Sequence, residues 1–349
     1  MKLYNFDFSK KIFFHPEKIV EYKQGKRPFP TTLEVDLTNR CNHRCFFCYS
    51  PKYLKTRQAS LDTNIIKQRL KEAYSLGTRG VSFTGGGEPM LHENFLEILE
   101  HSKNTGFDNG LMTNGSLINS KNAVELNRFL QWIRISMGGG DRDSYKLVQG
   151  VDHFERVIDN IKLLLQAKRR MKSKLNIGVR VLALKENIDS LKNLANILSD
   201  TNINYLQLAP NQFTDDDGKF WNADKTQQVF KNVNDILEPN GIMFLKSGYS
   251  TVQPRLEYPR TCYAHFFQVA IIAEGELTFC KNCRGNKKYY LGNIHQKSLN
   301  EIWNDDVVKK IESWAKPSNC GVFCKNMSLN KAMEDSLYPD ENMSPNFVN

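Results

Sequence analysis

The stretch Thr31–Cys48, TTLEVDLTNRCNHRCFFC, decides the fold. In its first part, residues 31–38, apolar and polar side chains alternate, which predicts a half-buried strand. Its second part places Cys41, Cys45 and Cys48 in the loop that follows this strand. Thiols clustered in one short loop can converge on a single site, so the loop predicts metal or redox chemistry rather than a disulfide.

The number of ligands in this loop bears on the kind of metal site. Zinc needs a fourth ligand, and His43 lies too close in sequence to Cys41 and Cys45 to close a tetrahedron comfortably. A four-iron cluster held by three cysteines leaves one iron without a protein thiolate, where a substrate or cofactor can coordinate. The loop therefore favours an iron–sulfur cluster with an open iron.

A second motif stands at the end of the next strand-like run, VSFT at residues 81–84. It reads GGGEP and comprises Gly85, Gly86, Gly87, Glu88 and Pro89. Glycines let a backbone approach a ligand closely, and proline fixes the turn into the helix expected near His92. The CxxxCxxC loop, with Phe47 before its third cysteine, and the GGEP motif together resemble the signatures of the radical S-adenosylmethionine (SAM) enzymes.

The resemblance implies a [4Fe-4S] cluster on Cys41, Cys45 and Cys48, with SAM bound to the open iron. The GGGEP motif would hold the amino group of SAM, and Phe47 would lie beside the adenine. In the family, polar residues at later strand ends contact the SAM ribose and carboxylate. The matching positions are Asn114, Ser136 and Arg180, although a salt bridge at the barrel rim is an alternative role for Arg180.

Strand and helix patterns alternate from residue 31 to about residue 210. The expected strands are 31–38, 79–84, 107–113, 131–137, 175–184 and 203–209, and the expected helices include 61–76, 92–104, 151–171 and 188–200. Ser60 and Asp62 offer an N-cap for the first helix. Six repeats with motif-bearing loops after the strands predict an α/β fold, a partial (β/α)6 barrel, which is also the radical SAM fold.

The domain boundaries follow from these patterns. The expected units are an N-terminal extension packed on the barrel (1–30), the barrel (31–215), a helical linker (216–255), a small α+β domain (256–335) and a tail (336–349).

The remaining cysteines lie in the small α+β domain and are Cys262, Cys280, Cys283, Cys320 and Cys324. Together with an Ala273-Glu274-Gly275 hairpin turn and an SLNEIWN helix, they resemble the SPASM/twitch extension of radical SAM enzymes. The resemblance implies one auxiliary [4Fe-4S] cluster, bound by four of these five thiols. A zinc ribbon is a weaker alternative because the cysteine pairs lie far apart.

The spare thiol cannot be named from the sequence. The spacing resembles the twitch domain of an aminocyclitol dehydrogenase, which would leave Cys283 over. Cys283 is then a candidate hydrogen-atom donor of an epimerase, or a buried structural thiol. If Cys320 or Cys324 is released instead, Cys283 is a cluster ligand.

The resemblance implies reductive cleavage of SAM to a 5′-deoxyadenosyl radical that abstracts hydrogen from a substrate, with flavodoxin or ferredoxin as reductant. Four basic residues adjoin the second cysteine group: Lys281, Arg284, Lys287 and Lys288. Facing the barrel mouth, they would suit an anionic small molecule. We expect oxidation or epimerisation of a nucleotide sugar or aminocyclitol. The rival is crosslinking, epimerisation or maturation of a ribosomally made peptide.

Composition and charge narrow the remaining classes of function. Lys and Arg outnumber Asp and Glu by 48 to 38, but the excess is diffuse. A metal-bound nucleic-acid-binding module would interleave basic and aromatic residues on one face and would leave GGGEP unused. No apolar run reaches about 18 residues and no signal peptide is visible, so we expect a cytoplasmic enzyme without a membrane or nucleic-acid partner.

Overall fold

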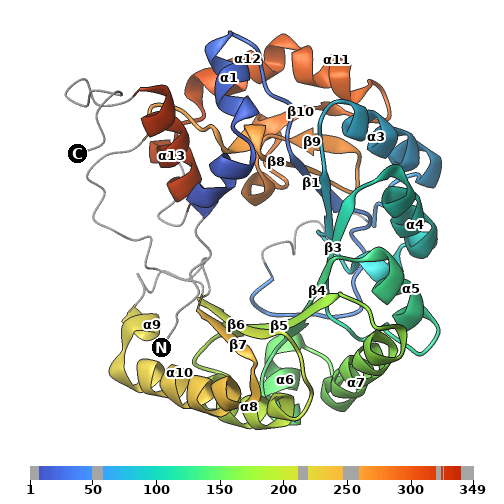
Figure 1. The fold of residues 1–349 in the computed structure, drawn as a ribbon, viewed down its shortest axis with the longest axis vertical. Helices are drawn as coiled ribbons and strands as arrows, with labels where there is room; N and C mark the ends of the chain where they lie inside the picture. Colours follow the sequence, from blue (N-terminus) through green and yellow to red (C-terminus); the bar gives the residue numbers. More distant parts are fainter. Residues whose placement is uncertain are drawn as a thin grey trace.

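One continuous sheet organises the protein, seen in a computed structural model that describes residues 8–48, 58–210, 219–246, 259–319, 324 and 326–338. Ten strands lie in the order β10-β9-β8-β1-β2-β3-β4-β5-β6-β7. The strands β1 to β7 are parallel to their neighbours and form the curved wall in Figure 1. Their bounds are Thr32–Asp36, Gly80–Thr84, Asp108–Thr113, Trp132–Met137, Asn176–Ala183, Tyr205–Pro210 and Met243–Lys246.

Helices cover the outer side of this wall (Figure 1). They are α3 (Thr63–Ser75), α4 (Phe95–Thr105), α5 (Asn122–Phe129), α7 (Phe154–Met171), α8 (Leu191–Ser199) and α10 (Asp224–Leu237). The shorter α6 (Arg142–Gln149) follows β4. Among the described residues, no helix is long and apolar enough to cross a membrane.

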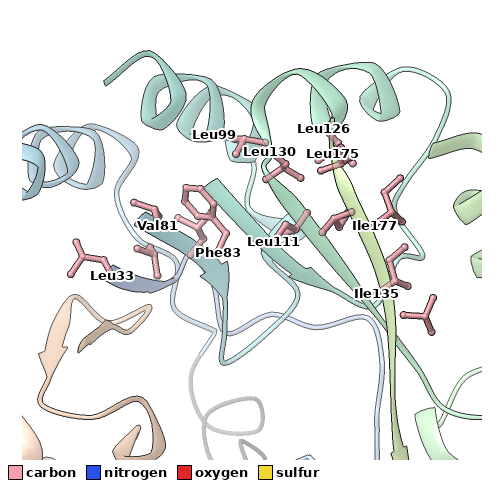
Figure 2. Close-up of a cluster of buried hydrophobic side chains, with 14 of the residues drawn as sticks. Leu33, Val81, Phe83, Leu99, Leu111, Leu126, Leu130, Ile135, Leu175 and Ile177 are labelled. Atoms are coloured by element: carbon pink, nitrogen blue, oxygen red, sulfur yellow. The ribbon is translucent and has the colours of Figure 1, made fainter. Parts of the chain in front are cut away.

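The alternation along each strand explains this layering. On β1, Leu33 and Val35 are fully buried and belong to the apolar layer between strands and helices, which Figure 2 shows. On β4, Trp132, Arg134 and Ser136 alternate with buried apolar residues and remain partly accessible. Because successive side chains point to opposite faces of a sheet, Arg134 and Ser136 line the inside of the barrel.

The predicted fold class is confirmed, and each of the six expected strands is present. Asp62 caps α3 by accepting hydrogen bonds of 2.9 Å from the backbone N–H groups of Asn64 and Ile65. Ser60 takes no part in this cap, because its hydroxyl donates to Thr38 Oγ1 at 2.7 Å.

The segment 216–255, expected as a helical linker, differs from that expectation. It contains α10, but it also adds β7 to the edge of the barrel, parallel to β6. The described part of this segment therefore extends the barrel.

The C-terminal region joins the same sheet. Strand β8 (Gln268–Ile271) pairs in parallel with β1, and β9 (Glu276–Thr278) and β10 (Tyr290–Asn293) follow as antiparallel strands. Gly275 makes the expected hairpin turn with a φ of +87°, which glycine adopts without strain. The helices α11 (Leu299–Asn304), α12 (Asp306–Trp314) and α13 (Met327–Leu337) complete this region.

The N-terminal extension packs chiefly on the C-terminal region, although the sequence predicted packing on the barrel. It contains η1 (Phe8–Phe14) and α1 (Glu17–Lys23). The Tyr22 ring meets the rings of Tyr263 and Phe266 at 5.7 and 5.5 Å. Arg27 forms an ion pair with Glu312 of α12. Aromatic side chains in the two terminal regions bury each other, a pairing that local sequence patterns do not reveal.

Candidate functional site

The glycine motif packs directly against the beginning of the cysteine loop. The Glu88 N–H donates to the Arg40 carbonyl at 2.8 Å. A Cβ on Gly86 would clash with the Asn39 side chain, and a Cβ on Gly87 would clash with the Arg40 carbonyl. The two glycines are therefore required for the close approach of the two loops.

Glu88 holds the glycine motif in place through buried hydrogen bonds. Its buried carboxylate accepts hydrogen bonds from Thr113 Oγ1 at 2.7 Å, the Asn114 N–H at 2.8 Å and the Met90 N–H at 3.2 Å. Burial raises the pKa of this carboxyl group, and the three donors oppose the shift. Glu88 thus joins the glycine motif to the end of β3.

Asn114 belongs to the same assembly. Its side-chain amide donates to Asn42 Oδ1 at 2.8 Å, and its oxygen accepts from the Ser116 hydroxyl at 2.7 Å. It also contacts the thiol of Cys41. The residue predicted from the third strand therefore supports the cysteine loop itself.

Helix α6 holds the middle of the cysteine loop. The N–H groups of Arg44 and Phe46 donate to the carbonyls of Gln149 and Val148 at 3.0 and 3.3 Å. Between them, the Cys45 thiol donates to Gln149 Oε1 at 2.6 Å. The Gln149 side chain in turn donates to the Ser136 carbonyl at 3.2 Å, so it links the loop to the end of β4.

The surroundings of Cys45 contain buried polar side chains. His43 Nδ1 and the Tyr145 hydroxyl are buried, and neither has a hydrogen-bond partner among the described residues. Burial, with the charge of His153, lowers the pKa of His43 to about 4, so this imidazole is neutral. Burial raises the pKa of Cys41 to about 11, and the charges of Cys41 and Cys48 add to the burial that raises the pKa of Cys45. The three thiols therefore lie within electrostatic range of one another.

The strand register brings two predicted residues together on the inner face. Ser136 on β4 pairs with Arg180 on β5, and Arg180 pairs with Gln207 on β6. Ser136 and Arg180 are partly accessible from inside the barrel. Phe47 is half-buried in the cysteine loop, with its ring 6.0 Å from the exposed ring of Phe46.

A buried charge network connects the inner face of β1 with the second cysteine group. Arg284 donates to Asp36 at 2.6 and 2.9 Å and to Glu34 at 2.8 Å, and Lys281 donates to Glu34 at 3.1 Å. Burial alone would raise the pKa of Glu34, but Lys281 and Arg284 lower it to about 2. At Asp36, burial outweighs Arg284 and raises the pKa.

This network bears on the anion-binding role that the sequence suggested for the four basic residues beside the second cysteine group. Arg284 and Lys281 face the inside of the barrel, but their charges are neutralised by Glu34 and Asp36. Lys287 and Lys288 are exposed at the surface. The four residues are therefore not a free anion-binding cluster.

The second cysteine group is held by buried polar contacts. The thiol of Cys283 hydrogen-bonds with that of Cys280, and this bond, with the charges of Lys281 and Arg284, lowers the pKa of Cys280 to about 7. Asn330 of α13 accepts from the N–H groups of Tyr263 and Ala264 at 2.8 Å, which fixes the turn after Cys262. Cys324 leads into α13, and Cys320 lies outside the described residues.

Both cysteine groups coincide with known families. Residues 35–198 match the model of the radical SAM superfamily, and residues 262–325 match that of the iron–sulfur cluster-binding domain SPASM. The chain belongs to the radical SAM superfamily and carries a SPASM domain. Its cofactors are accordingly SAM, a [4Fe-4S] cluster that binds SAM, and an auxiliary iron–sulfur cluster.

Two relatives show how far sequence similarity extends along the chain. The tungsten-containing aldehyde ferredoxin oxidoreductase cofactor-modifying protein of Pyrococcus furiosus is 26% identical over 303 residues, which cover 78% of this chain and 81% of that protein. A probable GTP 3′,8-cyclase of Sulfurisphaera tokodaii is 32% identical over 177 residues, which cover 50% of this chain and 54% of the cyclase. The chain thus matches about half of the cyclase's length.

Solved structures of radical SAM enzymes share the fold. Streptococcus suis SuiB bound to SAM superposes with a TM-score of 0.68 at 18% identity, covering 92% of this chain and 76% of SuiB. The enzyme anSMEcpe with bound SAM gives a TM-score of 0.58 at 18% identity, covering 86% of this chain and 88% of that enzyme.

The residues present fit the cofactors that the radical SAM family implies. Among the described residues, no three His, Cys, Asp or Glu side chains are gathered for a single metal ion. A cluster makes a different demand, because each thiolate binds a different iron atom. The mutually interacting thiols of Cys41, Cys45 and Cys48 meet this demand, and the unpaired Tyr145 hydroxyl beside Cys45 is a polar group that a bound cluster can satisfy.

Proposed function

We propose that this radical SAM enzyme acts on a small anionic molecule of the carbohydrate or nucleotide class, bound inside the barrel, and oxidises or epimerises it. The bound cluster and SAM supply a 5′-deoxyadenosyl radical, which abstracts hydrogen from the substrate. The protein supplies the positions of the reacting groups and a site shielded from water.

The observation that carries the substrate class is the environment of Arg134 on β4. Its guanidinium donates to Gln207 Oε1 at 3.2 Å and to Met112 Sδ at 2.8 Å, and both partners are neutral. Among the described residues, no carboxylate forms an ion pair with it. Burial lowers the pKa of Arg134, and Tyr205 and the charge of Glu34 oppose this shift, so a cation without a direct ion pair among the described residues faces the partly accessible interior. A carboxylate or phosphate can accept two parallel hydrogen bonds from a guanidinium.

Aromatic rings lie next to Arg134 on the inner face of the barrel. Trp132 precedes it on the same face of β4, and Tyr205 of β6 covers Gly178, which is the register partner of Arg134. A side chain at Gly178 would clash with the Tyr205 ring. Aromatic faces beside a cation suit a substrate that has both a ring and an anionic group, such as a nucleotide or a sugar phosphate.

The residues of the cysteine loop and the glycine motif take the binding roles in this proposal. Cys41, Cys45 and Cys48 hold the cluster, and four of the five C-terminal cysteines hold the auxiliary cluster. For SAM, Gly85, Gly86, Gly87, Glu88 and Pro89 shape its amino-acid site. Ser136, Arg180 and Phe47 complete the SAM site, with Asn114 placing the loop.

The relatives with named small substrates support the same class. The Sulfurisphaera tokodaii relative is named for GTP, a nucleotide with a phosphate chain. The Streptococcus suis enzyme has been solved with its precursor peptide, but at 17% identity this likeness shows the fold alone. Modification of a peptide therefore stands as the rival outcome of the experiment.

The first experiment tests SAM cleavage. The anaerobically reconstituted protein is expected to contain about eight irons and to form 5′-deoxyadenosine when reduced with dithionite. Cys45→Ala should contain about four irons and form none. 5′-Deoxyadenosine formation by Cys45→Ala would overturn the assignment of the SAM cluster.

The second experiment tests the substrate class. Uniformly deuterated nucleotide sugars, sugar phosphates and oligopeptides are supplied separately, and deuterium in 5′-deoxyadenosine identifies the hydrogen donor. We expect transfer from an anionic sugar or nucleotide, with at least a tenfold higher KM in Arg134→Gln. Arg128→Gln, at an exposed ion pair on α5, is the matched control. Transfer from oligopeptides alone would favour the rival.

A further inference from the structure

The cysteine loop reaches the surface on the side where it lies along α6. From Arg44 to Phe46 the loop hydrogen-bonds to the end of α6, and the Cys45 thiol donates to Gln149. Arg44 and Phe46 point outward, and the Phe46 ring remains 54% exposed. Cys45, a cluster ligand in the proposed function, is itself partly accessible and lies between these two exposed side chains.

Helix α6 (Figure 1) adds a second pair of side chains to this surface. Leu147 is 59% exposed and Lys146 is exposed beside it. Because Phe46 hydrogen-bonds to Val148 and Arg44 to Gln149, the loop and the end of α6 form one surface. We call Arg44, Phe46, Lys146 and Leu147 the entry patch.

The charge of the entry patch is positive. Arg142, at the start of α6, is neutralised by an ion pair with Asp152 at 2.5 Å. Arg44 and Lys146 form no ion pair with any residue that the structure describes. Two exposed apolar side chains flanked by two cations without a direct ion pair among the described residues are suited to a partner with an acidic rim and a small apolar centre.

We propose that the entry patch is the docking surface of an acidic one-electron carrier, a flavodoxin or ferredoxin, that reduces the SAM cluster. This inference rests on the proposed function, because only a cluster that must be reduced requires a carrier. One electron leaves the reduced carrier and enters the cluster, so the carrier is oxidised by one electron and no atom or proton is transferred. The patch flanks Cys45, so a carrier docked there lies next to a proposed ligand of the cluster.

The test compares a large reductant with a small one. Lys146→Glu/Leu147→Ser removes one cation and one apolar side chain without touching the cysteine loop. The matched control is Val20→Ser/Lys23→Glu on α1, which makes the same changes at an exposed pair far along the chain. Both variants are reconstituted with iron and sulfide, and stopped-flow absorbance follows cluster reduction by reduced flavodoxin, by reduced ferredoxin and by dithionite.

We expect the entry-patch variant to be reduced by its carrier at least tenfold more slowly than wild type at low salt. The difference should shrink at high salt, because exposed charges are then screened. Reduction by dithionite should be equal in all three proteins, as should thermal midpoints. An equal loss in the control variant, no loss in the entry-patch variant, or a wild type that neither carrier reduces would each overturn the inference. Failure of dithionite-reduced wild type to form 5′-deoxyadenosine would instead overturn the proposed function.

Discussion

The Asp36 carboxylate on β1 is bound by the Arg284 guanidinium of the SPASM domain through hydrogen bonds of 2.6 and 2.9 Å. Both side chains are buried, with exposed fractions of 1% and 4%. Asp36 also accepts a hydrogen bond from the Gly86 N–H. One carboxylate therefore joins the glycine motif to the turn that carries Cys280 and Cys283.

Arg284→Met should strongly destabilise the metal-free protein. It leaves Asp36 buried without its counter-charge, which costs about 3–5 kcal/mol in the free energy of unfolding. Chemical denaturation measures this loss. Arg128→Met, which breaks an exposed ion pair with Glu125, is the control and should cost about 0–1 kcal/mol. Equal losses in the two variants would mean that water reaches the carboxylates and that the network is not sealed.

The stability of the protein should depend on the ionisation of Glu34. Its pKa is about 2 in the folded protein, below its ordinary value of 4.5, because Lys281 and Arg284 outweigh burial. The ionised carboxylate therefore stabilises the fold fully above pH 4.5, and this contribution is lost as the pH falls toward 2. The stability difference between wild type and Glu34→Gln, from denaturation at successive pH values, should shrink across this window.

The stability difference between wild type and Asp36→Asn should change with pH in the direction opposite to that for Glu34→Gln. Burial raises the pKa of Asp36 in the folded protein, so wild type should gain stability relative to this variant as the pH falls. The same direction of change for both variants would show that the two carboxyl groups do not titrate in opposite senses.

The glycine motif should tolerate no Cβ where it meets the cysteine loop. In Gly87→Ala the new methyl group meets the Arg40 carbonyl, so we expect a loss of about 1–3 kcal/mol and weaker SAM binding. Gly80→Ala, whose Cβ would lie 3.3 Å from Thr32 Oγ1, is the control on β2. Iron content, SAM titration and denaturation check the prediction, and unchanged SAM affinity in Gly87→Ala would contradict it.

Cys283 should be a ligand of the auxiliary cluster rather than a hydrogen-atom donor. Its thiol already contacts that of Cys280, so a cluster bound by one lies within reach of the other. Cys283→Ala should therefore lose about four irons per chain, as Cys280→Ala should. Iron analysis after anaerobic reconstitution decides between the roles. Full iron content together with a changed stereochemistry of the product would instead assign Cys283 as the donor.

Local patterns were sufficient to predict most of the barrel. The alternation in residues 31–38 and the cap at Asp62 depend on neighbours in sequence, and both are present as expected. Strand β7 was missed because its four residues are too short to show a period. It becomes a strand because β6 offers it an unpaired edge, and that edge exists only in the folded protein.

The residues of the candidate site also divide into those that sequence patterns predicted and those that they missed. The first cysteine group and the glycine motif lie in short contiguous stretches, so their residue types and spacing were enough to predict a site there. Gln149 and the Glu34–Asp36–Arg284 network were missed because their partners lie far away in sequence. The basic character of Lys281 and Arg284 was visible, but the carboxylates that neutralise it face them only across the folded barrel.

The pairing of β8 with β1 has a consequence for biosynthesis. Thr32 leaves the ribosome long before its partner Gln268, and at roughly 5–20 residues per second the delay is on the order of 10–50 s. During that interval the first strand of the nascent barrel presents an open hydrogen-bonding edge, the kind of surface that templates aggregation. Strand β1 therefore gains its second neighbour only late in synthesis, and nascent chains truncated before residue 268 are the species that should require chaperones.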